Sequence, residues 1–164
     1  MSSQRSDLLR ITPARFVDRD SQALVAEVQA EYTLLYGAPD EAPLEVGELD
    51  PPGGAFFLGR LDDAPVAMGG WRRRPDVPAL GCTQTVEVKR MYVAPAARRR
   101  GFARQVLDHL EQTARDAGAD VVVLETGTMQ PEAIAMYTAA GYERVPDFGH
   151  YAWSPLSRCF GKRL

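Results

Sequence analysis

One stretch of this chain decides its fold, the segment EVKRMYVAPAARRRGFA at residues 87–103. Its pattern predicts a strand, a short basic loop with a single glycine, and the first turn of a helix. In that arrangement the bare N–H groups of the helix N-terminus and three neighbouring guanidinium groups face one point, which suits a phosphate or pyrophosphate. Gly101 lacks a Cβ atom, so a ligand can approach the backbone closely there.

The residues after this stretch complete a strand–helix–strand unit. Apolar residues recur at helical spacing after Gly101, and Gly118 is a suitable helix stop. An unbroken apolar run at residues 121–124 then predicts a central strand that is covered on both faces. Together these elements form a right-handed βαβ crossover, a common carrier of phosphate loops.

The rest of the chain adds strands and helices on both sides of this unit. Upstream, the pattern predicts a strand at 8–12, a helix that starts after Asp18 or Asp20 and ends at Gly37, a long loop at 37–54, and a hairpin of 55–61 and 65–72. Downstream, it predicts a helix at 131–141 and strands near 142–145 and 156–162. We expect one α/β domain over residues 1–164, with a mixed central sheet of about six to seven strands flanked by about four helices.

Side chains along the predicted strand at 85–93 alternate between the two faces of the sheet. One face is expected to carry Glu87, Lys89, Met91 and Val93, and the other Val86, Val88, Arg90 and Tyr92. Glu87 and Met91 would then lie on the same face, roughly 13 Å apart along the strand.

Composition excludes several classes of protein. The 164 residues are 45% hydrophobic and 25% charged, as in ordinary globular domains, and the net charge of −3 argues against nucleic-acid binding through a broad basic face. The N-terminus lacks the apolar segment of a signal peptide, and no run could span a bilayer. Cys82 and Cys159 show no metal-ligand spacing, so we expect reduced thiols, no metal and a cytoplasmic protein.

Two common phosphate motifs do not fit the basic loop. A P-loop ends in Gly-Lys-Ser/Thr, but Phe102 follows Gly101, and a dinucleotide fingerprint needs three spaced glycines where this loop has one. Taken alone, the loop could also be a solvated basic turn that begins a helix.

Two motifs in the expected order resemble those of the GCN5-related N-acetyltransferase (GNAT) family. Arg98-x-x-Gly101-x-Ala103 is similar to the family's acyl-CoA loop, Gln/Arg-x-x-Gly-x-Gly/Ala. The segment QPEAIAMYTAAGY at residues 130–142 resembles the family's Asn-x-x-Ala-x-x-Leu-Tyr-x-x-x-Gly-Phe, with Gln130 in place of the asparagine. The resemblance implies the GNAT fold and acetyl-CoA as the acetyl donor.

The resemblance also implies how the donor is held. Backbone groups of Met91, Tyr92 and Val93 would pair with the pantetheine arm like an additional strand. The loop would bind the pyrophosphate through backbone N–H groups, Gln130 would contact the pantetheine arm, and Tyr137 would contact the donor at its sulfur. The implied members of the loop are Arg98, Arg99, Arg100, Gly101, Phe102 and Ala103.

Three residues have implied catalytic roles. Glu87 would deprotonate the incoming amine through water, the Met91 N–H would stabilise the oxyanion, and Tyr137 would protonate the leaving thiolate. From the residues alone, Glu87 could instead form an ion pair with Lys89 or Arg90, and Tyr137 could simply pack in the core.

The implied reaction is direct acetyl transfer to a primary amine, most simply that of a small molecule. Tyr32, Tyr36, Arg72 and Tyr151 are the candidate acceptor-binding residues. A protein lysine or N-terminus is the alternative acceptor, and a non-catalytic CoA-binding regulatory module or a phosphate-binding interaction domain is the alternative from another class. Many members of the family dimerise, so the resemblance also allows a homodimer.

Overall fold

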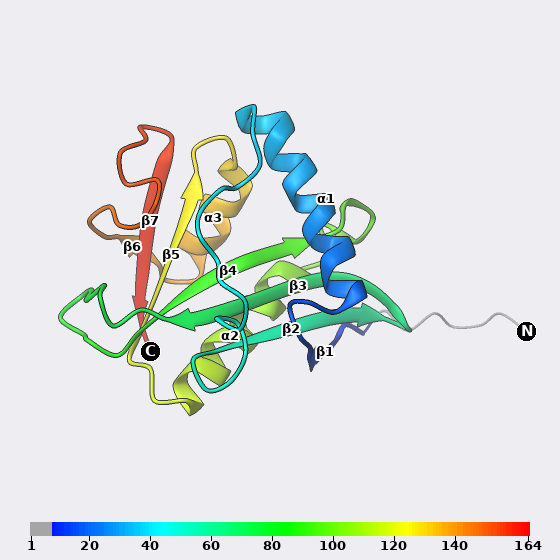
Figure 1. Cartoon of the computed structure of the whole chain (residues 1–164), viewed down its shortest axis with the longest axis horizontal. Coiled ribbons are helices and arrows are strands. Elements are labelled where there is room, and N and C mark those ends of the chain that lie inside the picture. The colour runs from blue at the N-terminus through cyan, green and yellow to red at the C-terminus, as the bar shows by residue number, and fades with distance from the viewer. Residues whose placement is uncertain (1–7) are drawn as a thin grey trace, which may run out of the picture.

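The computed structural model describes residues 8–164 and contains one seven-stranded mixed sheet (Figure 1). The strand order is β1-β2-β3-β4-β5-β7-β6, and only β4 and β5 are parallel neighbours. The strands are β1 (Arg10–Pro13), β2 (Gly54–Leu61), β3 (Ala64–Arg73), β4 (Thr85–Val93), β5 (Val121–Gly127), β6 (Glu143–Arg144) and β7 (Ser157–Arg163).

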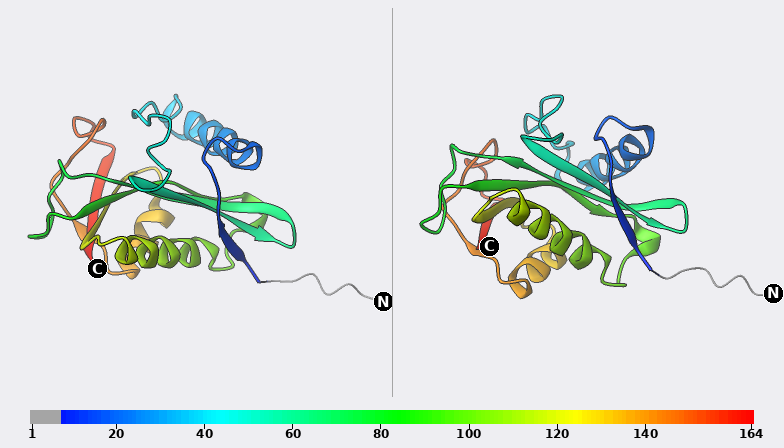
Figure 2. Two further views of the ribbon diagram at one scale, coloured as in Figure 1. Left: turned by 60° about the horizontal axis from the view of Figure 1, so that its bottom comes forward. Right: turned by 90° about the horizontal axis from the view of Figure 1, so that it is seen from below.

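Three α-helices cover the sheet in the described part of the chain. They are α1 (Arg19–Tyr36), α2 (Phe102–Asp116) and α3 (Pro131–Ala139), and a single 3₁₀ turn, η1 (Pro95–Ala97), links β4 to α2. α1 and the loop at 37–53 lie over one face of the sheet, and α2 and α3 lie over the other (Figure 2). The predicted α/β fold with a mixed sheet of about six to seven strands is confirmed. About four helices were expected, and the described residues form three α-helices and the 3₁₀ turn.

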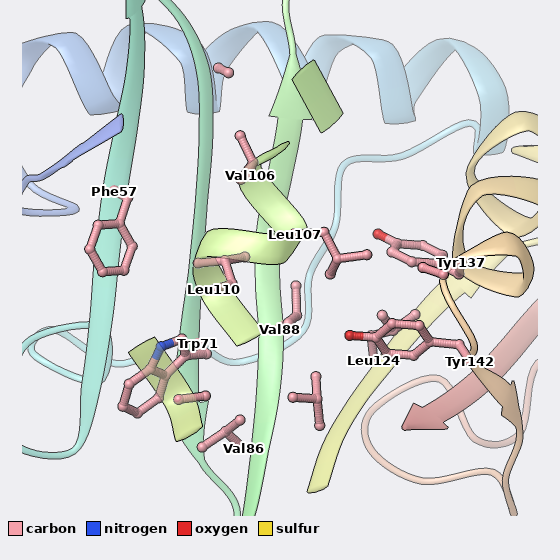
Figure 3. Packing of buried hydrophobic residues seen from close by; sticks show 14 of the residues in the cluster. Phe57, Trp71, Val86, Val88, Val106, Leu107, Leu110, Leu124, Tyr137 and Tyr142 are labelled. Carbon is pink, nitrogen blue, oxygen red and sulfur yellow. The ribbon is translucent and has the colours of Figure 1, made fainter. Parts of the chain in front are cut away.

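The main core lies between the sheet and α2. Val106, Leu107 and Leu110 of α2 are almost fully buried against Val86 and Val88 of β4 (Figure 3). A second cluster joins α1 to the opposite face of the sheet through Leu24, Val28, Phe56, Leu58 and Met68, so α1 buries one apolar side.

A β-bulge in β4 overturns the predicted alternation of side chains. Met68 pairs with Tyr92 but Gly70 pairs with Lys89, so Arg90 and Met91 together lie opposite Gly69. Arg90 adopts a left-handed backbone conformation with φ of 56°. The extra residue shifts the alternation by one position.

The bulge therefore places Glu87 and Met91 on opposite faces. Met91 packs with Val93 in the core on the α2 face, whereas Tyr92 lies in the α1 cluster. Arg90 points toward the α1 side as well, since its guanidinium donates to Asp40 in the loop after α1. The expected shared face of Glu87 and Met91 was wrong because one inserted residue reverses the order of faces downstream of it.

The parallel pairing of β4 and β5 is short. Only Thr85, Val86 and Glu87 pair with β5, at Val121 to Val123, and the two strands then diverge (Figure 1). Beyond that point β5 continues beside β7 and β4 continues beside β3. The edge of β4 from residue 88 to 93 thus has no strand neighbour on the β5 side.

Leu107 gives a direct test of the core. Its side chain is fully buried in α2, so Leu107→Ala should lower the free energy of unfolding by about 2–5 kcal/mol through lost burial and a residual cavity. Leu34→Ala is the matched control, because Leu34 is 88% exposed and its truncation should change stability by less than about 0.5 kcal/mol. Urea unfolding followed by circular dichroism measures both, and equal effects of the two substitutions would contradict the described core.

Candidate functional site

A cavity of about 1260 Å³ follows the gap between β4 and β5. Its walls come from α1, the loop at 38–41, the diverging halves of β4 and β5, the residues at 98–104, and α3. The predicted donor-binding residues Met91, Tyr92, Val93, Gln130 and Tyr137 all line it. Parts of the chain from α1 to α3 therefore meet around one long groove.

One end of this groove is the turn that begins α2. Arg99 and Gly101 adopt left-handed conformations, with φ of 64° and 79°. Within residues 8–164, the backbone N–H groups of Arg99, Gly101, Phe102 and Ala103 donate no hydrogen bond. A Cβ atom at Gly101 would meet nothing within 4 Å, so the space beside the turn is open. Free N–H groups at a helix N-terminus bind anions, which fits the predicted pyrophosphate loop.

The arginines of this turn differ in what they contact. The Arg98 guanidinium makes two bonds to Glu31 of α1, at 3.0 and 2.8 Å, and also donates to the carbonyl of Val93. Arg100 stacks over the ring of Phe102, whose side chain is buried in the core. Arg98 thus links α1 to the end of β4. Its positive charge would also attract a phosphate bound at the turn.

A second cavity, of about 470 Å³, lies on the α1 face of the sheet. It is bounded by the loop at 42–48, the ends of β3 and β4, and the residues at 148–151. Lys89, Glu125 and Tyr151 line both cavities and so mark their junction. Of the four predicted acceptor-binding residues, Arg72 lines the smaller cavity, Tyr151 lines both, and Tyr32 and Tyr36 line the larger one.

Glu87 is held by two arginines. Its carboxylate is 3% exposed, and its Oε1 accepts hydrogen bonds from Arg72 Nε at 2.9 Å and Arg74 Nη1 at 2.6 Å. Arg72 also contacts Glu48, and Arg74 also contacts Asp76. Glu87 is therefore ion-paired, as one of the sequence alternatives held, but its partners lie on and just after β3 instead of being Lys89 or Arg90.

Glu125 is a site residue that the sequence analysis missed. It lies on β5 where the strand leaves β4, lines both cavities, and accepts a hydrogen bond from the Ser157 hydroxyl at 2.9 Å. Burial raises the pKa of this carboxyl, although the Ser157 bond and the charge of Lys89 oppose the shift. The sequence did contain a sign of this residue, because Glu125 directly follows the apolar run 121–124. A carboxylate in a buried strand is unfavourable unless it is hydrogen-bonded, ion-paired or used in function.

Tyr137 lies close to Glu125 in the wall of the larger cavity. Its ring packs edge-to-face with Tyr142 at 5.7 Å, and Figure 3 shows the hydroxyl directed away from α3, toward the side of α2 and β4. Within the described residues this hydroxyl has no hydrogen-bond partner. Burial raises the pKa of Tyr137, with Tyr32 and Glu125 adding to the shift, so the phenol stays protonated at neutral pH.

Gln130 makes its contacts inside the protein. Its Oε1 accepts from the Tyr36 hydroxyl at 3.3 Å and from Thr126 at 3.5 Å. The Tyr36 hydroxyl also lies so close to Gly127 that a Cβ atom there would be 1.8 Å away. The glycine at the end of β5 thus leaves the space that the Tyr36 ring occupies when it contacts Gln130.

Residues 8–164 lack two other kinds of functional feature. No helix there combines the length and hydropathy that a membrane crossing requires. No group of three or more His, Cys, Asp or Glu side chains in the same residues is arranged to hold a metal ion.

The raised pKa of Glu125 has a consequence for stability. Between the pKa of an unfolded glutamate and the higher folded value, the native state binds more protons than the unfolded state, so the free energy of unfolding falls as pH rises through that window. Glutamine does not ionise, so the Glu125→Gln variant lacks this fall in the free energy of unfolding. The stability of the variant relative to wild type should therefore increase as pH is raised from about 4 upward. Glu143→Gln on the exposed strand β6 is the control and should give a difference independent of pH. Urea unfolding at pH 4, 5, 6 and 7 measures the trend, which a pH-independent difference for Glu125→Gln would contradict.

Comparison with known proteins agrees with this architecture. Residues 21–142 match the family model described as the acetyltransferase (GNAT) family. An IAA acetyltransferase of Azospirillum brasilense is 42% identical over 78 residues, which are 48% of this chain and 51% of that protein. Human N-acetyltransferase 8 is 27% identical over 126 residues, which are 77% of this chain and 55% of that protein. The chain therefore spans about half the length of these curated relatives.

A solved structure extends the likeness over the whole fold. A crystal structure of a Klebsiella pneumoniae protein assigned as an acyl-CoA N-acyltransferase superposes with a TM-score of 0.79 at 27% identity, covering 97% of this chain and 99% of that one. Together with the match over residues 21–142, this likeness shows that the chain belongs to the GNAT acetyltransferase family.

Proposed function

We propose that this protein transfers the acetyl group of acetyl-CoA directly to a primary amine. The observation that carries the proposal is the gap between β4 and β5, which opens a groove that runs from the free N–H groups at the start of α2 to the junction with the second cavity. Membership of the acetyltransferase family and the names of the relatives support it. Acetyl-CoA would supply an activated thioester, and the residues of the groove would position it.

The unpaired edge of β4 is suited to hold the donor. Backbone groups at 88–93 lack a strand neighbour on the β5 side, so the amide-containing arm of CoA could add to this edge as a short strand. The bulge at Arg90 and Met91 also releases backbone groups from the ladder with β3. The Met91 N–H is the proposed oxyanion donor, and the turn at 98–103 is the proposed pyrophosphate site.

Glu125 suits the role of general base better than Glu87. The Oε1 of Glu87 already accepts hydrogen bonds from Arg72 and Arg74, so this carboxylate is engaged inside the protein. Glu125 faces the junction of the cavities, and burial raises its pKa, which makes it a stronger proton acceptor. Glu87, the residue implied by the sequence, would then act in the second cavity by holding Arg72 and Arg74 in place.

Tyr137 is the proposed acid. In the transfer, the amine nitrogen bonds to the thioester carbon, the carbon–sulfur bond breaks, and the amine proton goes to Glu125. The sulfur leaves as a thiolate that accepts a hydrogen bond from the Tyr137 hydroxyl, through which it takes up a proton that solvent replaces. Because burial raises the pKa of Tyr137 above that of an ordinary phenol, its main contribution is a hydrogen bond that stabilises the leaving thiolate.

A panel of primary amines with acetyl-CoA tests the proposal. Thiol release should depend on the amine, and Tyr137→Phe should lower kcat by at least about tenfold, because loss of one hydrogen bond to a developing charge costs a few kcal/mol. Affinity for CoA, measured by calorimetry, should stay near the wild-type value. Absence of amine-dependent thiol release would refute the enzymatic proposal, and an unchanged kcat in Tyr137→Phe would remove this residue from it.

The two glutamates can be separated by the pH dependence of kcat/KM. Glu125→Gln should reduce kcat/KM by about 10²-fold or more and abolish the acidic limb of the profile, as expected for loss of a general base. Glu87→Gln should lower thermal stability, because it weakens a buried ion-pair network, and should retain the acidic limb. Loss of the limb in Glu87→Gln alone would assign the base to Glu87 instead.

A further inference from the structure

The ammonium group of Lys89 lies at the junction of the two cavities and lacks a bonded counter-ion. The residue is only 9% exposed and lines both cavities. Among residues 8–164 it takes part in no ion pair or hydrogen bond. Burial of a cation costs desolvation free energy, which a paired anion offsets. This position is therefore suited to an anionic ligand.

Two acidic groups that interact electrostatically with Lys89 already have other hydrogen-bond partners. Asp40 and Glu125 both feel the charge of Lys89. Asp40 accepts bonds from Arg90 at 2.5 Å and from the Ala42 N–H at 2.9 Å, and Glu125 accepts from Ser157. Burial would raise the pKa of Asp40, but Lys89 and Arg90 lower it below its usual value, so Asp40 stays ionised beside Arg90. Neither carboxylate lies within ion-pair distance of Lys89.

The neighbouring arginines differ from Lys89 in this respect. Arg72 and Arg74 point into the same cavity but are bound to Glu87, and each has a second acidic partner, Glu48 for Arg72 and Asp76 for Arg74. Lys89 is thus the cation at this junction whose charge is left for an incoming molecule.

The donor is not suited to supply that anion. Its phosphates are expected at the turn 98–103, beyond the far end of β4, whereas Lys89 precedes the bulge near the start of the unpaired edge. The anion would therefore belong to the acceptor. A single lysine among several carboxylates favours a monoanion over a phosphate dianion, because each further negative charge would face Glu125 and Asp40.

We propose that the acceptor is an amino acid or a close amino carboxylate, whose carboxylate pairs with Lys89 while its amine lies against Glu125. This inference rests on the proposed acetyl transfer and narrows its substrate class. Lys89 and Glu125 face the same junction with opposite charges, which matches the two ends of such a molecule. A protein N-terminus or a lysine side chain lacks a carboxylate at this distance and would leave Lys89 unpaired.

Matched acceptors test the inference. The twenty L-amino acids are assayed for thiol release with acetyl-CoA, and each one that reacts is compared with its decarboxylated amine and its amide. Wild-type kcat/KM should be at least tenfold higher for the amino acid than for either counterpart. Lys89→Met should lower kcat/KM at least tenfold more for the amino acid than for its decarboxylated amine, so that the preference disappears. Lys89→Arg, which keeps the charge, should retain part of the preference.

Folding and donor binding provide the control for these variants. Because Lys89 has no bonded partner, Lys89→Met should keep or raise the thermal midpoint and leave CoA affinity unchanged. Equal reaction of amino acids and their amines in wild type, or a preference that survives Lys89→Met, would overturn the carboxylate assignment while acetyl transfer stands. Faster reaction of a peptide N-terminus than of any amino acid would also overturn it. No thiol release with any acceptor would remove both proposals.

Discussion

The interruption of pairing between β4 and β5 is the feature on which the candidate site depends. β5 is hydrogen-bonded to β7 along its whole length, and β4 stays beside β3, so each strand follows a different partner once their three shared pairs end. The gap leaves backbone groups unpaired in the interior of a sheet, where such groups normally find partners. A ligand with amide groups of its own can satisfy them, and for this reason the groove is better explained by binding than by packing.

The bulge at Arg90 determines which side chains face which cavity. Without it, Met91 would share a face with Glu87, and Tyr92 would lie in the α2 core. With it, Arg90 and Tyr92 point toward α1, where Arg90 binds Asp40 and Tyr92 donates to Glu27 at 3.2 Å. Together with the Arg98–Glu31 pair, these contacts hold α1 and its following loop along β4 and so form one wall of the groove.

Charged groups around the site fall into two sets. One set is satisfied by partners within the protein, as for Glu87 with Arg72 and Arg74, and it gives the second cavity a fixed shape. The other set is Lys89, Glu125 and Tyr137, of which Lys89 and Tyr137 are buried and Glu125 is half-buried. All three line the larger cavity and lack a full complement of partners. Proteins rarely leave such groups unpaired, so these three are where chemistry or binding is expected.

The sequence alone was enough to predict the α/β fold and the order of the elements, and it marked the turn at 98–103 as a candidate anion site. Hydrophobic periodicity sets the elements, and the glycines at 37, 101 and 118 mark helix ends because the chain takes left-handed conformations there. Tertiary structure decided which faces and partners the site residues have. A one-residue bulge cannot be recognised in a run of alternating residues, so the face of Met91 could not be predicted. The partners of Glu87, the exposure of Glu125 to both cavities and the lack of a counter-ion at Lys89 depend on strands that are distant in sequence, and only the folded sheet brings them together.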